Sequence, residues 1–167
     1  IFSGFWTESN DKKANVRNQE EKKIELNVIQ QWEEFVFESN DAGKMAVSIY
    51  ETINAGDKYS SDDWSEYTAN NKLWVVRVAW KNIGTKPTSK YLGDFNLLLQ
   101  TADGKQYRPR AVEQVNKDKR PEGYLGCVSC ANNPWDKSVE DVIFDINEEN
   151  VDGAKLVFEE DNIAFEL

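Results

Sequence analysis

The chain has 167 residues, with 30 acidic, 20 basic and no histidine side chains, and its formal charge is −10. This length fits one domain with or without a tail, and the excess of acid would repel a polyanion, which argues against nucleic acid as a partner. The lack of histidine removes every Ser-His or Cys-His nucleophile pair and the side chain that most often serves as a general base near neutral pH.

The first 23 residues differ from the rest of the chain. An apolar stretch, IFSGFW (1–6), is followed over residues 7–23 by a segment with many charges and few apolar side chains. Six residues cannot span a membrane, which takes about 20, but aromatic residues at such a boundary are typical of the outer end of a signal or a membrane anchor. We therefore expect residues 1–23 to be a polar tether or short helix, with membrane contact only through an anchor upstream.

The apolar pattern of the next segments, from Ile24 to Ile83, increasingly favours β-strands. Between Ile24 and Phe37 the apolar residues fit both a helix face and two strands, and the choice stays open. Over residues 45–53 a period of two appears, which puts these apolar residues on one face: Met45, Val47, Ile49 and Ile53. The clearest strand is LWVVRVAWKNI (73–83), whose alternation separates Trp74, Val76, Val78 and Trp80 from Arg77 and Lys81. We expect it to be the central strand of the core.

Shorter runs follow. Phe95, Leu97 and Leu99 lead to Asp103-Gly104, which suits a tight hairpin because both residues tolerate a positive φ, and Tyr107 lies on the return strand. A late strand places Val142, Phe144 and Ile146 inward, with Asp141, Ile143 and Asp145 outward. Two last strands carry Leu156/Phe158 and Ile163/Phe165/Leu167. Seven or eight short strands with turns between them predict an all-β sandwich or barrel over residues 24–167.

Several motifs occur in a characteristic order. They are LWVVRVAWKNIGTKP (73–87), DFNL (94–97), the hairpin DGKQY (103–107), the turn PWDKS (134–138) leading to Phe144, and KLVF (155–158). Over residues 42–167 this order resembles a family of telokin-like, immunoglobulin-like domains of unknown function on bacterial and archaeal lipoproteins and surface proteins. The resemblance implies an immunoglobulin-like β-sandwich of about seven or eight antiparallel strands outside the cytosol, and no catalytic residues.

The chain departs from this family at one turn. Where the family has Pro-Gly, this sequence has Pro134-Trp135, which makes a positive φ at the second residue doubtful. The link between Tyr107 and Pro134 is also long for the family.

That link contains the pair Cys127 and Cys130. Redox chemistry would require a helix N-terminus beneath the first thiol, but Pro134 follows closely and disfavours helix before it. A structural zinc site usually has four Cys or His ligands, which this chain does not offer. We expect a local disulfide that staples the 108–135 loop, as an oxidising compartment would allow, with two free thiols as the alternative.

The same loop offers candidates for partner binding. Arg108 and Arg110 are among its basic residues and would attract an acidic partner, although ordinary solvated charge explains them as well. Tyr124 and Trp135 flank the cysteines, and exposed aromatic residues often anchor interfaces. The alternative is that both aromatic side chains fold back onto the end of the sandwich.

Two acidic stretches raise the question of calcium. Asp57, Asp62 and Asp63 lie in one polar segment, and DINEEN (145–150) faintly resembles a calcium loop. The second stretch has Asn150 where such a loop needs glycine. We expect no cofactor and no metal site, with calcium as the alternative.

Together these features predict a non-catalytic binding or structural module outside the cytosol, either secreted or at the cell surface, with or without a membrane anchor, that contacts a protein partner. The alternative is an accessory domain that stabilises a larger envelope enzyme or transport assembly. Catalysis is disfavoured because no histidine and no convincing nucleophile–base pair is present.

Overall fold

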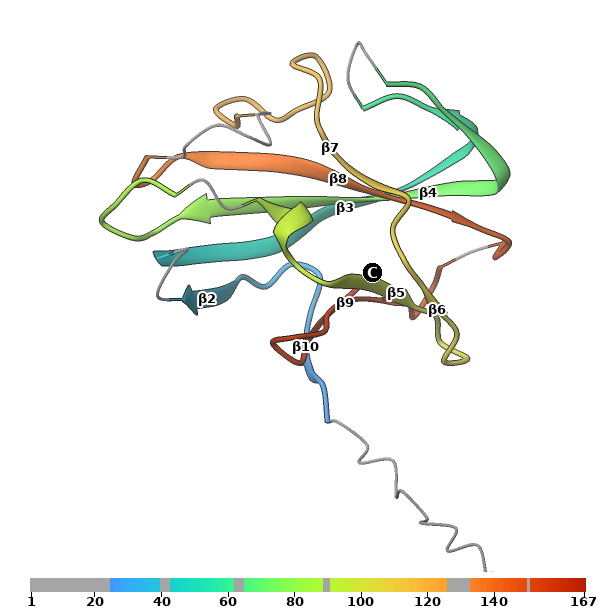
Figure 1. The fold of residues 1–167 in the computed structure, drawn as a ribbon, viewed down its shortest axis with the longest axis horizontal. Coiled ribbons are helices and arrows are strands. Elements are labelled where there is room, and N and C mark those ends of the chain that lie inside the picture. Colours follow the sequence, from blue (N-terminus) through green and yellow to red (C-terminus); the bar gives the residue numbers. More distant parts are fainter. Residues whose placement is uncertain (1–24, 40–42, 62–64, 89–90, 126–132, 150) are drawn as a thin grey trace, which may run out of the picture.

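The computed structural model describes residues 25–39, 43–61, 65–88, 91–125, 133–149 and 151–167. Its strands form two five-stranded sheets, which lie one above the other (Figure 1). Sheet A has the order β1-β10-β9-β5-β6 and sheet B the order β2-β3-β4-β8-β7. The predicted immunoglobulin-like β-sandwich is therefore confirmed, and the predicted tether over residues 1–23 lies outside the described residues.

The strands of sheet A are short and those of sheet B include three long ones. Sheet A consists of β1 (Asn27–Ile29), β5 (Leu97–Gln100), β6 (Gln106–Tyr107), β9 (Lys155–Phe158) and β10 (Ile163–Glu166). Sheet B consists of β2 (Phe35–Ser39), β3 (Gly43–Tyr59), β4 (Tyr67–Asn82), β7 (Ala111–Gln114) and β8 (Lys137–Ile146). A 3-10 turn, η1 (Leu92–Asp94), lies between β4 and β5. The pairs are antiparallel except for β1 and β10, which run parallel.

The segment that fitted either a helix or two strands forms two strands, and each belongs to a different sheet. β1 joins the edge of sheet A and β2 the edge of sheet B, so the chain crosses between the sheets over residues 30–34. Phe37 is buried in the core and Ile29 and Phe35 pack against it. Two strands form here in place of a helix, because the period of two directs the apolar side chains of both short strands into the same core.

The core between the sheets contains the inward residues that the alternation predicted. Trp74, Val76, Val78 and Trp80 of β4 meet the apolar residues of β8, β5, β9 and β10 there. Four phenylalanines form a chain of ring contacts, with centroids 5.0 to 5.7 Å apart: Phe37, Phe95, Phe158 and Phe165. Such tilted and edge-to-face pairs each add about 0.5–1.5 kcal/mol beyond the burial of their area.

One carboxylate lies within this core. Glu140 of β8 is fully buried, and its two oxygens accept hydrogen bonds from Trp80 Nε1 at 3.0 Å and from the backbone N–H of Leu92 at 2.8 Å. It thereby ties η1 to sheet B. Burial raises the pKa of Glu140 to about 7, because the two donors compensate only part of the lost hydration.

The outer face of sheet B is covered at one end, which the sequence did not reveal. Leu73, Val75 and Ile143 are fully buried there beneath apolar residues of the long β3–β4 hairpin and of β7. Figure 1 shows this hairpin curling over the sheet beside β7. Asp141 and Ile143 lie on the outer face, as the alternation predicted, yet both are fully buried there.

A β-bulge in β3 changes the face of the sheet on which the following side chains lie. Ile49 pairs with Val78 and Glu51 with Arg77, so Tyr50 is an extra residue in the ladder. The bulge shifts the alternation by one residue, and Ile53 consequently packs on the outer face, against the cluster of Leu73, Val75 and Ile143. The expectation that Ile53 shares a face with Met45 is wrong for this reason.

The hairpin at Asp103-Gly104 is confirmed. Leu99 pairs with Tyr107 and Gln100 with Gln106, and Gly104 has a φ of +87°. Glycine reaches this left-handed conformation without a steric penalty, which closes the turn between β5 and β6.

Candidate functional site

The structure brings two of the four predicted partner-binding residues to the outer face of sheet B. Leu125 forms a parallel bridge with Ser138 of β8, and this extends the sheet beyond the end of β7 and sets Tyr124 beside Lys137. Trp135 precedes β8, and Lys81 of β4 lies over its ring. Tyr124 and Trp135 therefore flank the part of this face that the β3–β4 hairpin leaves open.

The register across sheet B puts charged and small residues in one row. Val36 of β2 pairs with Ala46 of β3, Ala46 with Lys81 of β4, and Lys81 with Lys137 of β8. Ser48 and Ala79 pair in the next row on the same face. These short side chains leave a hollow between longer neighbours.

A small, shallow groove with a volume of about 70 Å³ lies in this hollow and is open to solvent. We call it the outer groove. Its lining residues are Glu34, Ala46, Ser48, Ala79, Trp80, Lys81, Tyr124 and Lys137. Small side chains form the floor, Glu34 lies at the β2 side, and the two lysines and Tyr124 lie towards β8. The arrangement combines flat aromatic rings and positive charge around a narrow floor.

Both lysines of the outer groove lie over aromatic rings. Lys81 Nζ lies 4.8 Å from the centroid of Trp135, and Lys137 Nζ lies 5.6 Å from that of Tyr124. Tyr124 in turn contacts Tyr50 at the bulge, with ring centroids 6.3 Å apart. Among the described residues neither lysine has a carboxylate within 4.0 Å. Cation–π contact positions each ammonium group but leaves its charge unneutralised.

Trp135 has an unusual backbone conformation for its type. Its φ is 73°, so it keeps the positive φ that the Pro-Trp sequence made doubtful. The turn is held by the Trp135 N–H, which donates to the carbonyl of Asn82 at 2.6 Å, and by the Asp136 N–H, which donates to Asn133. A bulky residue costs about 1–2 kcal/mol in this region, where glycine would cost almost nothing. The side chain held at this cost is 66% exposed.

Tyr124 differs from Trp135 in its burial. It packs against a small buried cluster, Ala79, Val115 and Val139, and is only partly exposed. Of the two aromatic candidates, Tyr124 thus folds back onto the sandwich, as one alternative had it, while Trp135 stays open to solvent. Tyr124 serves as a wall of the outer groove and as part of its support.

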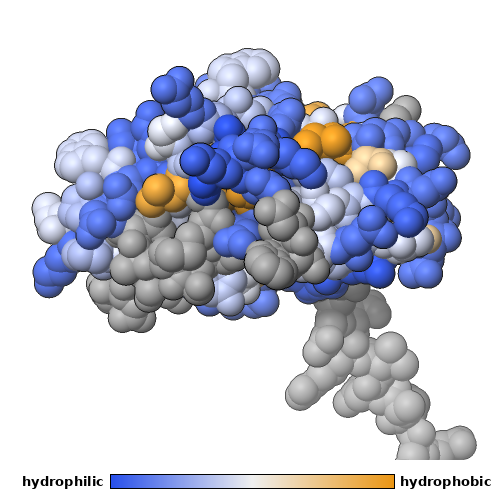
Figure 2. Space-filling view, turned by 90° about the horizontal axis from the view of Figure 1, so that it is seen from above, coloured by the Kyte–Doolittle hydropathy of each residue, from blue (hydrophilic) through white to orange (hydrophobic). Residues whose placement is uncertain are grey.

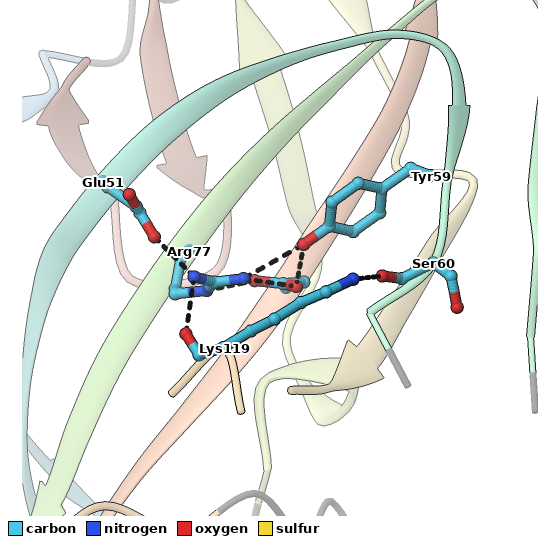
Figure 3. A network of polar contacts seen from close by, with 6 residues as sticks. Glu51, Tyr59, Ser60, Arg77 and Lys119 are labelled. Carbon is cyan, nitrogen blue, oxygen red and sulfur yellow. Dashed lines mark hydrogen bonds and ion pairs between the residues drawn. The ribbon is translucent and has the colours of Figure 1, made fainter. Parts of the chain in front are cut away.

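A buried polar network holds the segment that carries Tyr124. Arg77 of β4 is 4% exposed and donates from Nε to Asp141 Oδ1 at 2.8 Å and from Nη2 to Asp141 Oδ2 at 3.1 Å. It also pairs with Glu51, and its Nη1 donates to the carbonyl of Lys119 at 3.1 Å. Figure 3 shows the guanidinium between these groups. Arg77 thus ties β3, β8 and the 115–125 segment together.

The same network reaches the tip of the β3–β4 hairpin. Tyr59 Oη donates to Asp141 Oδ2 at 2.6 Å and accepts from Arg77 Nη2 at 3.0 Å. Lys119 Nζ donates to the carbonyl of Ser60 (Figure 3). Burial and the neighbouring Asp141 raise the pKa of Tyr59, so its hydroxyl stays protonated as a donor. We call this set the clasp: Glu51, Tyr59, Arg77, Lys119 and Asp141.

The groups of the clasp stabilise the fold, because they are bonded to one another and to the chain. Burial opposes the charge of Arg77, but hydrogen bonds and the charge of Asp141 outweigh it and raise the pKa of Arg77. Every strong donor in it is already committed to an acceptor of the chain. One sign of the clasp is visible in the sequence, an arginine inside the apolar run LWVVRVAW, but the partners of this arginine lie far away along the chain.

The two arginine candidates lie apart from the outer groove and are engaged within the chain. Arg108 contacts Glu159 and donates to the carbonyl of Leu97 at 3.2 Å. Arg110 donates to the carbonyl of Thr68 at 2.7 Å and pairs with Asp145 at 3.0 Å. Both charges are thereby offset by acidic neighbours, and they fasten segments of the sandwich to one another.

The remaining candidate sites are the cysteine pair and the acidic stretches of the calcium alternative. Cys127 and Cys130, with the predicted disulfide, lie outside the described residues, as do Asp62, Asp63 and Asn150 of the calcium alternative. Asp145 accepts the backbone N–H groups of Asn70 and Asn71 at 2.9 Å. Within the described ranges no three His, Cys, Asp or Glu side chains are grouped so that they could hold a metal ion.

Sequence reasoning named Lys81 only as an outward residue and did not single out Lys137. Their pairing depends on the β4–β8 register, which joins residues 56 positions apart and leaves no local pattern.

The part of the chain that the structure describes contains no helix long and apolar enough to cross a membrane.

Comparison with known proteins identifies the fold. A scan against protein-family models finds no match, and a search of curated proteins finds none either. The chain is similar to the crystal structure of MPT63, a secreted protein from Mycobacterium tuberculosis, with a TM-score of 0.57 and 10% sequence identity. The likeness covers 85% of this chain and 98% of MPT63. At this identity it supports the β-sandwich architecture and nothing beyond the fold.

Proposed function

We propose that the protein is a non-catalytic module that binds a protein partner through the outer face of sheet B, with Trp135 as the anchor. One observation carries this proposal: an exposed tryptophan occupies a position of positive φ where glycine would be less strained. Strained non-glycine residues concentrate at functional sites, and tryptophan is the residue most enriched among interface hot spots.

The character of the surface agrees with a partner that associates and dissociates. The face seen in Figure 2 is mostly hydrophilic, with small and separate hydrophobic spots. Interfaces of permanent complexes are larger and more apolar, whereas non-obligate interfaces have a polarity close to that of the remaining surface. Trp135 and the half-exposed Tyr50 would then supply the few strong contacts.

We further propose that the module acts outside the cytosol, at the cell surface or as a secreted protein. The apolar start of the chain and the cysteine pair favour this location, and a protein with a similar fold, MPT63, is secreted. Membership of the telokin-like family, an upstream anchor and the disulfide stay predictions with the same implication.

The test compares tryptophan variants in partner capture. The purified protein is immobilised, an envelope extract of the source organism is passed over it, and retained proteins are quantified by mass spectrometry. The account predicts that Trp135→Ala and Trp135→Gly lose a protein that the unmodified chain retains, while both remain folded with a cooperative thermal transition. Trp32→Ala is the matched control, because Trp32 is also highly exposed but, among the described residues, has no lysine of the outer groove over its ring, as Trp135 does.

Capture that is unchanged in both Trp135 variants would contradict the proposal. It would favour the accessory-domain alternative, in which the sandwich stabilises a larger assembly without recognising a partner through this face.

A further inference from the structure

We propose that the outer groove binds a carboxylate-rich segment of a protein partner in extended conformation, and that Lys81 and Lys137 pair with its carboxylates. This inference rests on the proposed function and adds the chemistry of the partner. It uses the lysine pair, the narrow floor of the groove and the charge of the whole molecule.

Electrostatic repulsion between the two lysines lowers the stability of the free protein. Lys81 and Lys137 are direct cross-strand neighbours, and like charges in this position repel each other. Elsewhere on sheet B the lysines Lys44, Lys58 and Lys72 each have a glutamate partner. In a chain of net charge −10, acidic side chains are abundant, yet among the described residues no carboxylate lies within 4.0 Å of either lysine. An external anion would remove the repulsion and supply the missing partners.

The aromatic rings prepare the two ammonium groups for a ligand. Trp135 and Tyr124 hold Lys81 and Lys137 at the groove, which reduces the side-chain freedom that binding would otherwise have to remove. The rings cannot accept a proton or form an ion pair, so the charges remain available to a carboxylate.

The groove is small, so it would take side chains of an extended peptide and not its backbone. At its floor Ala46 and Ala79 are almost fully buried, while Ser48 is partly exposed. Alternate side chains of an extended peptide project on one side about 6.6 Å apart. Two lysines on neighbouring strands, with Cβ atoms about 5 Å apart, can reach two such carboxylates together. Glu34 at the β2 side would repel acid, so we expect the carboxylates at the β8 side.

The experiment is a titration with defined peptides, followed by the amide chemical shifts of the protein in two-dimensional NMR. The probe is a blocked octaglutamate peptide, with octaglutamine as the neutral control and an oligogalacturonate as an acidic polysaccharide. Two double variants remove the same charge: Lys81→Gln with Lys137→Gln in the groove, and Lys58→Gln with Lys105→Gln elsewhere. Lys58 lies on the β3–β4 hairpin and Lys105 in the β5–β6 turn, and both are exposed.

The proposal predicts that octaglutamate binds and octaglutamine does not, with shifts centred on Ala46, Ser48, Ala79, Lys81 and Lys137. The affinity for octaglutamate should be at least about fivefold lower in the groove variant, since the loss of two exposed ion pairs removes a small free energy for each. The affinity of the unmodified chain should fall when salt is raised, because salt screens these pairs. The other double variant should bind like the unmodified chain. The groove variant should keep or raise its melting temperature, because the repulsion between the lysines is gone.

Equal loss in both double variants would overturn the proposal, because net charge alone would then explain binding. Tighter binding of oligogalacturonate through the same lysines would also overturn it and make an acidic polysaccharide the ligand. If Trp135-dependent capture persists but octaglutamate binds no better than octaglutamine, this inference fails and the proposed function stands. If the peptide binds through the lysines but Trp135 variants capture normally, the proposed function fails instead.

Discussion

Trp135 combines an exposed indole with a backbone conformation that its side chain makes unfavourable. Comparison of Trp135→Gly with Trp135→Ala isolates the strain, because both variants lose the indole and its contact with Lys81. We expect Trp135→Gly to be the more stable of the two by about 1 kcal/mol, since only glycine reaches φ 73° without a clash.

Urea unfolding of both variants measures this difference. If Trp135→Ala were equally or more stable, the turn would not impose a positive φ, and the argument that Trp135 is retained for function would lose its basis.

Glu140 predicts a pH dependence of stability. Its pKa rises from the ordinary 4.5 to about 7 in the folded chain, so the folded state holds a proton that the unfolded state has lost between these values. The stabilisation from this proton is complete below about pH 4.5 and is lost as pH rises through about 7. The linked change in the free energy of unfolding is about 3 kcal/mol.

The measurement is urea unfolding of the unmodified chain and of Glu140→Gln at pH 5 and pH 8. Glutamine cannot titrate, so the variant should show a much smaller loss of stability between the two pH values, whatever its stability at either one. The same loss in both proteins would show that Glu140 does not carry the effect.

At the scale of elements, the clasp decides how the 115–125 segment lies on sheet B. Asp141→Ala removes the buried partner of Arg77 and leaves only the half-exposed Glu51 to offset its charge, so this variant should destabilise the chain by about 3–5 kcal/mol. The double variant Arg77→Met with Asp141→Leu removes both charges and should cost clearly less than Asp141→Ala alone. Lys58→Ala is the surface control, because it breaks an exposed pair with Glu66 that is worth under about 1 kcal/mol.

Chemical unfolding of the four proteins tests this account of the clasp. Should Asp141→Ala cost no more than Lys58→Ala, the clasp would contribute little, and the position of Tyr124 would depend on its apolar contacts with Val115 and Val139 alone.

The elements also show how far local pattern extends. Alternation identified the inner face of β4 and β8 and the hairpin at Gly104, because these depend on neighbours in sequence. It left β1 open between helix and strand, and it missed β7, whose four residues are all half-buried and therefore show no period of two. It also misplaced Ile53, because the bulge at Tyr50 reverses the faces without any change in composition.

The candidate site was less accessible from the sequence than the fold. Tyr124 and Trp135 could be named because they are aromatic residues in a polar loop. The outer groove could not, since it is formed by the β3–β4–β8 register, and neither could the covering of Asp141 and Ile143 by a hairpin that returns from far along the chain. Arg108 and Arg110 looked available because their partners, Glu159 and Asp145, follow 51 and 35 residues later.

At the scale of the whole molecule, the account assigns different tasks to the two sheets. Sheet A closes the core, and sheet B presents the face that we propose as the partner-binding surface. Val36 and Val28 are partly exposed valines on edge strands, the first on the outer face of sheet B and the second on β1 of sheet A. A photoreactive amino acid at each position therefore reports which sheet a partner touches.

The most direct test places p-benzoylphenylalanine at position 36 or 28 and irradiates the protein in envelope extract. The account predicts a cross-linked partner from position 36 that disappears with Trp135→Ala, and none from position 28. A partner that cross-links from position 28 and not from position 36 would contradict the assignment of the binding face to sheet B.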